Sequence, residues 1–196
     1  MNTELFSEKY LPDAGKLVFQ QWQQEFPEIP ETCKPLIYQY LPHYYYYADS
    51  PFNLQVTDGK QLCAFLLAHG VEHVQNRAAA FLDSLRTNGN TELLDAYQSY
   101  LDYNRSAEHA ALQPGEIILD LFVSIRPGCG RLLLSRFEEL LRNQGRGGYL
   151  LWTDDTCDFD YYQRHNFLEV KRFPNTPVFS EKTLTTYLFR KELAAL

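Results

Sequence analysis

The chain has 196 residues, 45% of them hydrophobic, and its 18 basic and 25 acidic side chains give a formal net charge of −7. This length and composition are typical of one globular domain with its own core, and they exclude an intrinsically disordered protein. The acidic balance argues against nucleic acid as a partner. It is compatible with a cationic substrate, although the same charge also serves solubility alone.

Neither a membrane span nor a disulfide framework is expected. No apolar run approaches the roughly 20 residues of a membrane helix, and the first ten residues, MNTELFSEKY, lack the pattern of a secretory signal. The cysteines are scattered, without metal-ligand spacing, at Cys33, Cys63, Cys129 and Cys157. We interpret them as reduced thiols and expect a cytoplasmic protein without a bound metal.

The first part of the chain predicts a short strand, two helices and a hairpin. We expect the strand over residues 3–6 and helices over residues 12–26 and 32–42, with Thr32 as the N-cap of the second helix. Four consecutive tyrosines, residues 44–47, follow without single-face periodicity, as in a half-buried connector. Strands over residues 53–57 and 61–68 then form a hairpin across Asp58-Gly59.

Residues 71–113 predict two helices. The first has an apolar stripe of Ala78, Phe81, Leu82 and Leu85, ended by Asn88-Gly89. The second begins at the N-cap Asn90, and its inward-facing residues are Leu93, Leu94, Tyr97 and Leu101. The segment is too short to bury its own core, so we expect one domain over residues 1–196.

The rest of the chain alternates strands and helices. Residues 116–125 are apolar on both faces, which is typical of a central strand covered on both sides. A helix from about Arg131 to Gly145, a strand over 149–153 and a short helix follow. Asp155, Thr156 or Asp158 could cap the short helix, and strands over 167–173 and 183–190 complete the chain. The order predicts an α/β fold with a mixed sheet.

A glycine-rich turn, Arg126-Pro127-Gly128-Cys129-Gly130, links the predicted central strand to the next helix. The first N–H groups of a helix lack intrahelical partners, so such a turn can bind an anion. Gly128 and Gly130 would let the backbone approach a pyrophosphate closely. An ordinary tight turn is the alternative. The missing third glycine and the missing Gly-Lys-Ser/Thr exclude a dinucleotide fingerprint and a P-loop.

Two motifs carry a resemblance to a known family. The turn resembles motif A of the GNAT superfamily of N-acetyltransferases, Arg/Gln-x-x-Gly-x-Gly/Ala, and the sequence YYQRHNF from Tyr161 to Phe167 resembles the family's Phe-Tyr-x-x-x-Gly-Phe. Arg126 stands one residue closer to the first glycine than in the family. Asn166 replaces a glycine, which is conservative because Asn tolerates the left-handed conformation at helix ends. The resemblance covers the C-terminal half by motif and the N-terminal half by element order only.

The resemblance implies a GNAT-like mixed sheet flanked by helices, with residues 71–113 as a two-helix insertion before the central strand. It also implies transfer of acetyl from acetyl-CoA to a primary amine on a small molecule or peptide. The cofactor contacts that it implies are Val123, Arg126, Gly128, Cys129, Gly130, Arg131 and Asp155. The alternative is a GNAT-like module that binds an acyl-CoA or a partner protein without catalysis. A monomer and a homodimer stay equally open.

Three residues are candidates for proton transfer. Tyr162 aligns with the tyrosine that in this family commonly protonates the leaving thiolate, and a phenol with a pKa of about 10 can donate a proton at neutral pH; the alternative is a core aromatic. Glu116 and Asp120 are candidate bases, which strand alternation places on one face with Ile118 and Phe122. Apolar neighbours would raise the pKa of such a carboxylate. Glu116 could equally be a solvated strand end.

The resemblance also places the tyrosine run of residues 44–47 beside the acceptor, as an aromatic wall. Tyr97, Tyr100 and Tyr103 share one flank of the second helix of residues 71–113. We expect this flank to meet the tyrosine run and the two helices to fold over the acceptor side of the cleft. The alternatives are padding of the back of the sheet or a dimer contact.

Overall fold

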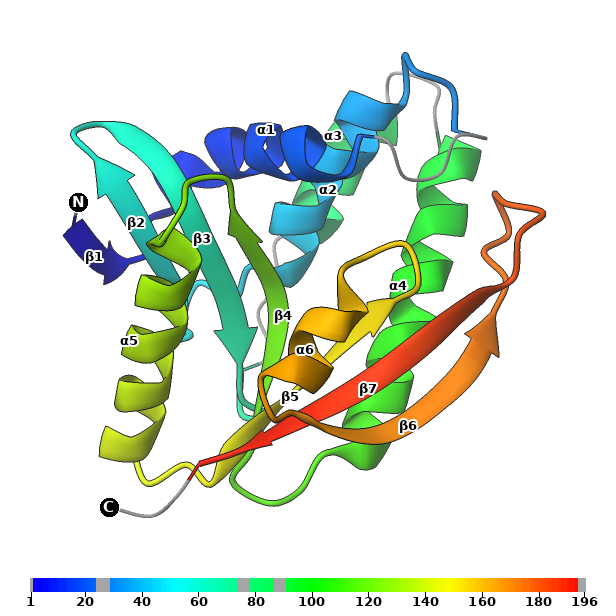
Figure 1. The fold of residues 1–196 in the computed structure, drawn as a ribbon. Helices are drawn as coiled ribbons and strands as arrows, with labels where there is room; N and C mark the ends of the chain where they lie inside the picture. Colours follow the sequence, from blue (N-terminus) through cyan, green and yellow to red (C-terminus); the bar gives the residue numbers. More distant parts are fainter. Residues whose placement is uncertain (1, 24–28, 74–77, 87–90, 194–196) are drawn as a thin grey trace.

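The computed structural model describes residues 2–23, 29–73, 78–86 and 91–193. They form one mixed sheet whose seven strands lie in the spatial order β1-β2-β3-β4-β5-β7-β6 (Figure 1). The strands are β1 (Asn2–Leu5), β2 (Leu54–Asp58), β3 (Gln61–His69), β4 (Ile117–Ser124), β5 (Gly148–Asp154), β6 (Leu168–Asn175) and β7 (Leu184–Glu192). The elements follow the predicted order, so the α/β class and the mixed sheet are confirmed.

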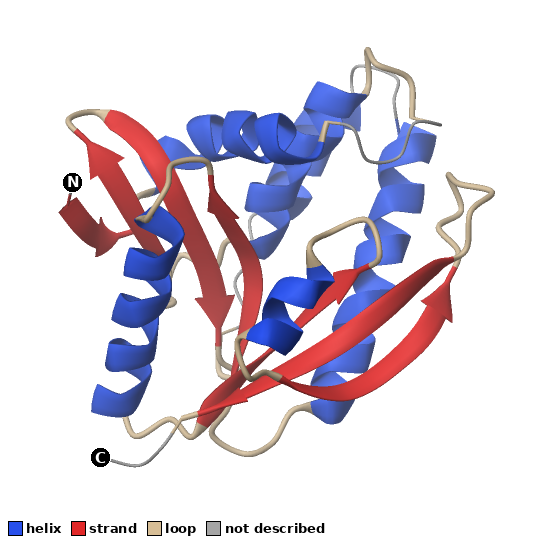
Figure 2. Ribbon diagram, viewed as in Figure 1, coloured by secondary structure: helices blue, strands red, loops and turns tan. Residues whose placement is uncertain are grey.

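Helices cover both faces of the sheet (Figure 2). They are α1 (Leu11–Trp22), α2 (Lys34–Tyr45), α3 (Ala78–Arg86), α4 (Thr91–Ala111), α5 (Cys129–Asn143) and α6 (Phe159–Arg164), with a 3-10 turn at Glu8–Tyr10. Helices α1, α2 and α4 lie on one face, and α5 and α6 lie on the other. Within the described part of the chain, no helix has the length and apolar character of a membrane span.

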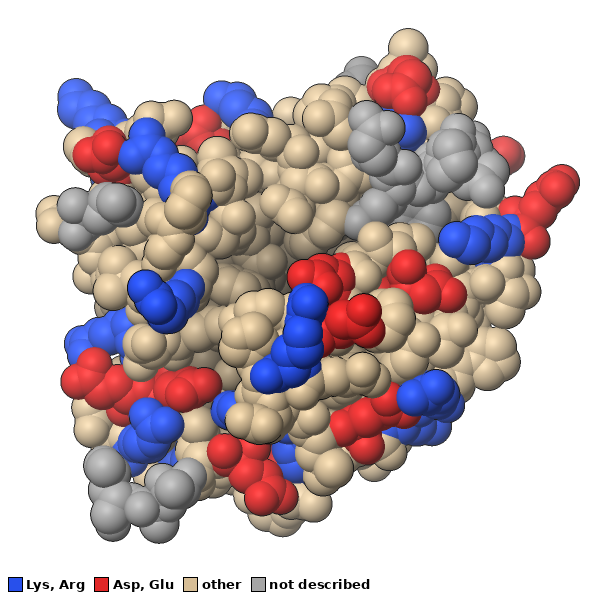
Figure 3. Space-filling model, viewed as in Figure 1, with Lys and Arg blue, Asp and Glu red and all other residues tan. Residues whose placement is uncertain are grey.

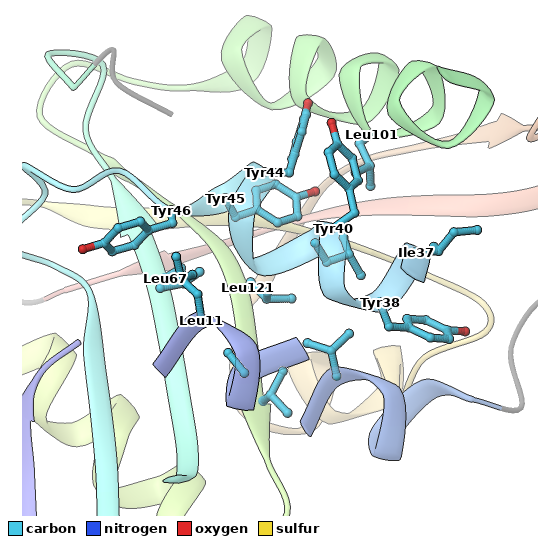
Figure 4. Close-up of a cluster of buried hydrophobic side chains, with 14 of the residues drawn as sticks. Leu11, Ile37, Tyr38, Tyr40, Tyr44, Tyr45, Tyr46, Leu67, Leu101 and Leu121 are labelled. Carbon is cyan, nitrogen blue, oxygen red and sulfur yellow. The ribbon is translucent and has the colours of Figure 1, made fainter. Parts of the chain in front are cut away.

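Two hydrophobic clusters hold the layers together. The cluster under α1, α2 and α4 is rich in tyrosine, and Figure 4 shows Tyr40, Tyr44 and Tyr45 packed in it with leucines from α1, the sheet and α4. The cluster under α5 contains Leu133 and Phe137, which are fully buried. Burial of each such side chain stabilises the fold by roughly 1.5–3 kcal/mol.

Helix α2 differs from its prediction at both ends. Its N-cap is Cys33 and not Thr32, and the helix continues through Pro42 to Tyr45. A proline costs one intrahelical hydrogen bond, but the turn that follows it buries two tyrosine rings, which favours continuation of the helix. The run Tyr44–Tyr47 is therefore fully buried and is not a half-buried connector.

Two predicted left-handed positions are confirmed. Gly145 has a φ of +67° directly after α5, and Asn166 has a φ of +60° after α6. Helix α6 has Asp158 at its N-cap position, although no side chain bonds to its first N–H groups. The predicted cap at Asn88–Asn90 lies outside the described residues.

Strand β4 pairs very differently with its two neighbours. Its antiparallel register with β3 extends over most of the strand, whereas its parallel register with β5 consists of Ile117↔Tyr149 and Ile118↔Leu150 within the described strands. Beyond this point β4 and β5 diverge and leave a V-shaped opening in the sheet (Figure 1).

A β-bulge interrupts β4 at Asp120. Leu67 pairs with Leu121 and Ala68 pairs with Leu119, so Asp120 is the extra residue. The bulge reverses the alternation, because Leu119 packs in the α5 cluster and Leu121 in the opposite one, while Phe122 contacts the α5 cluster. The expectation that Phe122 shares a face with Asp120 is therefore wrong.

The contact between β5 and β7 generates the first testable prediction. A Cβ at Gly148 would lie 2.4 Å from the carbonyl oxygen of Lys191 in β7. We expect Gly148→Ala to lower the free energy of unfolding by about 1–3 kcal/mol, because the strands would have to move apart. Gly147→Ala is the matched control, since nothing lies within 4 Å of its Cβ position. Urea denaturation measures both, and equal stabilities would contradict the prediction.

Candidate active site

A pocket of about 270 Å³ lies where β4 and β5 diverge, and Figure 3 shows this face of the molecule hollowed near its centre. Both strands supply wall residues, together with the C-terminal part of α1, helix α2 and the region of α6. The lining residues are Gln21, Trp22, Leu41, Tyr45, Leu119, Asp120, Leu121, Phe122, Ser124, Leu151, Trp152, Thr153, Cys157, Asp158, Tyr161 and Tyr162. The pocket thus brings together two of the three predicted catalytic residues, Asp120 and Tyr162.

The pocket is apolar with an acidic bias. Most of its walls are aromatic or aliphatic, and its carboxylates come from Asp120 and Asp158. Among the described residues that line it, none is a lysine, arginine or histidine. This chemistry favours a ligand that combines an apolar body with positive charge.

Asp120 lies in the pocket wall at the bulge of β4, but its carboxylate is turned inward. The side chain is fully buried, and Oδ2 lies 2.6 Å from Nδ1 of His69 at the end of β3. Oδ1 has no hydrogen-bond partner among the described residues. An unpartnered buried carboxylate oxygen is costly, so its presence beside a pocket points to a functional role.

Tyr162 belongs both to the pocket and to the α5-side cluster. Its ring lies 5.2 Å from the ring of Phe167 and 5.4 Å from that of Phe189, centroid to centroid. Burial, with smaller contributions from Cys157 and Asp158, raises the pKa of Tyr162 above its usual value. The phenol therefore carries its proton at neutral pH, as a proton donor must.

Glu116 occupies a different place from the one expected of a base. It precedes β4, where it is buried and accepts a 2.7 Å hydrogen bond from Nε of Arg190 in β7. Arg190 also donates to the carbonyl of Ala111, and the N–H of Gln113 donates to Glu116. Glu116 is neither a solvated strand end nor a lining residue of the pocket. Glu116 ties the start of β4 to β7 at the point where β4 still pairs with β5.

The glycine-rich turn has the geometry of an anion site. Gly128 is the N-cap of α5 with a φ of +84°, and no side chain caps this helix. The Cys129 N–H donates to the carbonyl of Arg126, so the N–H groups of Gly130 and Arg131 are the ones in the first turn that have no hydrogen-bond partner among the described residues. A Cβ at Gly130 would lie 3.1 Å from the ring of Phe122, so this glycine allows the helix to approach β4 closely. Ser124, which precedes the turn, lines the pocket. The turn and pocket therefore adjoin and fit a ligand with a phosphate group at one end.

The remaining predicted cofactor residues do not line the pocket. Arg126 is tied to the β2–β3 hairpin through Asp58 Oδ2 at 2.6 Å. Asp155 accepts a hydrogen bond from the Thr185 N–H. Cys129 and Val123 bury their side chains in the core, so only their backbone groups are available, and Arg131 is exposed.

Tyr97 and Tyr100 of α4 pack in the same hydrophobic cluster as Tyr44 and Tyr45, but neither they nor Tyr103 line the pocket. Tyr100 donates to Asp154 of β5 and packs edge-on against Trp152, while Tyr103 packs against Phe173 of β6. Tyr97 packs on Phe179. Helix α4 directs this flank toward the half of the sheet formed by β5, β7 and β6, and none of its described side chains lines the pocket.

Helix α4 also contacts the tyrosine run through the polar side chains of Asp102 and Arg105. The hydroxyl of Tyr44 bonds to Asp102, and the Arg105 guanidinium lies 4.1 Å from the centre of the Tyr44 ring. Tyr45 is the member of the run that lines the pocket. His69 and Arg105 were missed at the sequence level, because nothing local in the sequence links them to Asp120, and their proximity depends on strand register and helix docking.

The ion pair of Glu116 generates a prediction that separates a structural role from a catalytic one. Glu116→Gln leaves the buried Arg190 charge without its partner, so we expect the free energy of unfolding to fall by on the order of 3 kcal/mol. Chemical denaturation measures this loss. Glu139→Gln, which removes an exposed pair with Arg136, should change stability little. An unchanged stability of Glu116→Gln would contradict the structural assignment.

Comparison with known proteins identifies the fold. Neither a protein-family model nor a curated protein sequence matches the chain. Among solved structures, the ribosomal-protein-S18-alanine N-acetyltransferase from Escherichia coli is 15% identical with a TM-score of 0.53, covering 100% of this chain and 95% of that one.

Two further solved structures are similar to the chain over nearly its whole length. The ribosomal-protein-alanine N-acetyltransferase from Brucella melitensis is 12% identical with a TM-score of 0.55, covering 98% of this chain and 100% of that one. An aminoglycoside 6'-acetyltransferase type Ii is 13% identical with a TM-score of 0.52, covering 98% of this chain and 97% of that one. The predicted resemblance is confirmed at the level of architecture: the chain has the fold of the GNAT acetyltransferases.

Proposed function

We propose that this protein is an acetyl-CoA-dependent N-acetyltransferase that acts on a primary amine. The observation that carries the proposal is one pocket, at the opening between β4 and β5, that is lined by Asp120 and Tyr162 and extends to Ser124, two residues before the turn at the start of α5. The fold supports acyl transfer, because the similar structures are named as acetyltransferases. Their names include both a ribosomal-protein alanine and an aminoglycoside, so the fold leaves the acceptor open.

The residues present fit acetyl-CoA. Its pyrophosphate would be held by the backbone of Gly128–Gly130 and the open first turn of α5. Its pantetheine arm would lie along β4 beyond Ile118, where the backbone facing β5 has no partner strand. When bound, acetyl-CoA supplies the activated acetyl thioester.

The chain itself handles the protons. Asp120, which lines the pocket and whose Oδ1 has no hydrogen-bond partner among the described residues, takes a proton from the ammonium of the acceptor on this oxygen. The phenol of Tyr162 gives its proton to the departing thiolate. The aromatic and aliphatic walls exclude water from both transfers and strengthen the electrostatic interactions within the pocket.

The cofactor assignment is tested by Gly128→Val. A valine at a φ of +84° is strained, and its side chain would project where the pyrophosphate is expected. We expect isothermal titration calorimetry to show at least a tenfold loss of acetyl-CoA affinity in the folded variant. Gly145→Val is the matched control, because it puts the same strain at the opposite end of α5. Absence of acetyl-CoA binding by the wild-type protein at high micromolar concentration would overturn the proposed function.

The role of Tyr162 is tested by Tyr162→Phe, which keeps the ring and removes the proton. We expect the acetylation rate to fall roughly 10²–10⁴-fold with little change in acetyl-CoA affinity. Tyr149→Phe is the control, since Tyr149 is a buried tyrosine that also packs on Phe167 but lies outside the pocket lining. Steady-state kinetics with a responsive amine compares the variants, and an unchanged rate in Tyr162→Phe would return this residue to a packing role.

A further inference from the structure

We propose that the acceptor is a small primary amine attached through a short chain to an aromatic or compact apolar group, without a carboxylate. This inference rests on the proposed function and deepens it by naming the substrate class. It depends on which end of the pocket the acceptor occupies, on the walls at that end and on their charge.

The two ends of the pocket have different surroundings. Ser124 leads into the turn before α5, and Tyr162 packs against the α5-side cluster, so these two residues mark the end where the cofactor is expected. Trp22 of α1 and Leu41 of α2 mark the end toward the opposite face of the sheet. With acetyl-CoA at the α5 end, the acceptor occupies the end toward α1 and α2.

The walls of this acceptor end are apolar and held in place. They consist of Trp22, Leu41, Tyr45, Leu121 and Trp152. Figure 4 shows Tyr45 and Leu121 in the buried cluster, and Tyr45 is fixed edge-on against Tyr44 at 4.8 Å. Trp152 packs edge-on against Tyr100 at 5.8 Å. Preformed aromatic walls favour a flat or compact apolar group and bind it with little cost of ordering.

The charged residues of the pocket lining decide whether a basic or an acidic group on the ligand is tolerated. Asp120 and Asp158 are the charged residues of the lining, of which Asp158 is exposed and paired with Arg164 and Asp120 is paired with His69. The described lining residues offer no cation to neutralise an acidic group on a ligand. An ammonium is attracted to the carboxylates and to the indole faces. A carboxylate on the acceptor would be buried without a partner beside like charge, which is strongly unfavourable.

The size of the pocket narrows the class further. A volume of about 270 Å³ must hold the reacting acetyl group as well as the acceptor. It is therefore matched to one ring or a similar apolar group on a short chain. A long polyamine would leave further ammonium groups against apolar walls, where each lacks a counter-charge.

The proposal is tested with three amines that separate these features. 2-Phenylethylamine carries the predicted combination, phenylalanine adds only a carboxylate to it, and spermidine lacks the apolar body. We expect kcat/KM with acetyl-CoA to be on the order of 100-fold higher for 2-phenylethylamine than for either of the others. Equal or higher rates with phenylalanine or spermidine would overturn the substrate class.

A binding measurement separates this proposal from the proposed function. The chain has two tryptophans, Trp22 and Trp152, and both line the pocket, so intrinsic tryptophan fluorescence reports its occupancy. We expect 2-phenylethylamine to change the fluorescence at concentrations where phenylalanine does not. If acetyl-CoA binds but no such difference appears, the substrate class is wrong and the proposed function stands. If acetyl-CoA does not bind, the proposed function itself fails.

A variant at the acceptor end completes the test. Trp22→Ala removes one wall, so we expect the KM for 2-phenylethylamine to rise roughly tenfold while the KM for acetyl-CoA stays unchanged. Gln20→Ala is the matched control, because Gln20 is exposed on α1 and does not line the pocket. A KM for 2-phenylethylamine that is unchanged in Trp22→Ala, or changed equally in Gln20→Ala, would contradict the placement of the acceptor.

Discussion

The divergence of β4 and β5 is the constraint on which the candidate site depends. Two parallel strands that separate after two residue pairs leave backbone groups without ladder partners on both facing edges. Such edges are costly unless a ligand or water satisfies them, so the sheet carries a built-in binding groove. The pocket lies in this opening, and Asp120 lies at the bulge just beyond the last pair.

An open sheet of this kind needs reinforcement where its strands still meet. The Glu116–Arg190 pair provides it by linking the start of β4 to β7 across β5, with both side chains buried. Asn104 of α4 adds a second tie on the same face, where its Oδ1 accepts from Asn175 and Thr186 at the β6–β7 edge. These contacts join β4, β7 and β6 to one another and to α4 at the closed end of the groove.

The fold was predictable from the sequence to the extent that its signals are local. The hairpin at Asp58-Gly59, the apolar stripe of α5 and the glycine turn at Gly128 each specify their conformation within a few residues, and the structure agrees with them. The bulge at Asp120 was not predictable, because it exists only in the register between β3 and β4. The partners of Glu116 and Asp120 lie 74 and 51 residues away along the chain, at Arg190 and His69, so neither could be inferred from spacing.

Local sequence signals also do not show how a helix docks, which is why α4 was predicted to fold over the acceptor side of the cleft. The helix offers no described side chain to the pocket, yet it supplies the charges behind the pocket wall. Arg105 is electrostatically coupled to the buried Asp120, and Glu108 is completely buried beside both. Burial, with Asp120 adding to it, raises the pKa of Glu108 well above its usual range.

A buried carboxylate without compensation would instead lose its charge and with it the capacity to act as a base at neutral pH. The buried carboxylate of Asp120 has two compensating groups: His69 bonds to one of its oxygens, and Arg105 places positive charge near it from α4. The described part of α4 therefore lies behind the wall that carries Asp120, and none of its described side chains lines the pocket as a lid would.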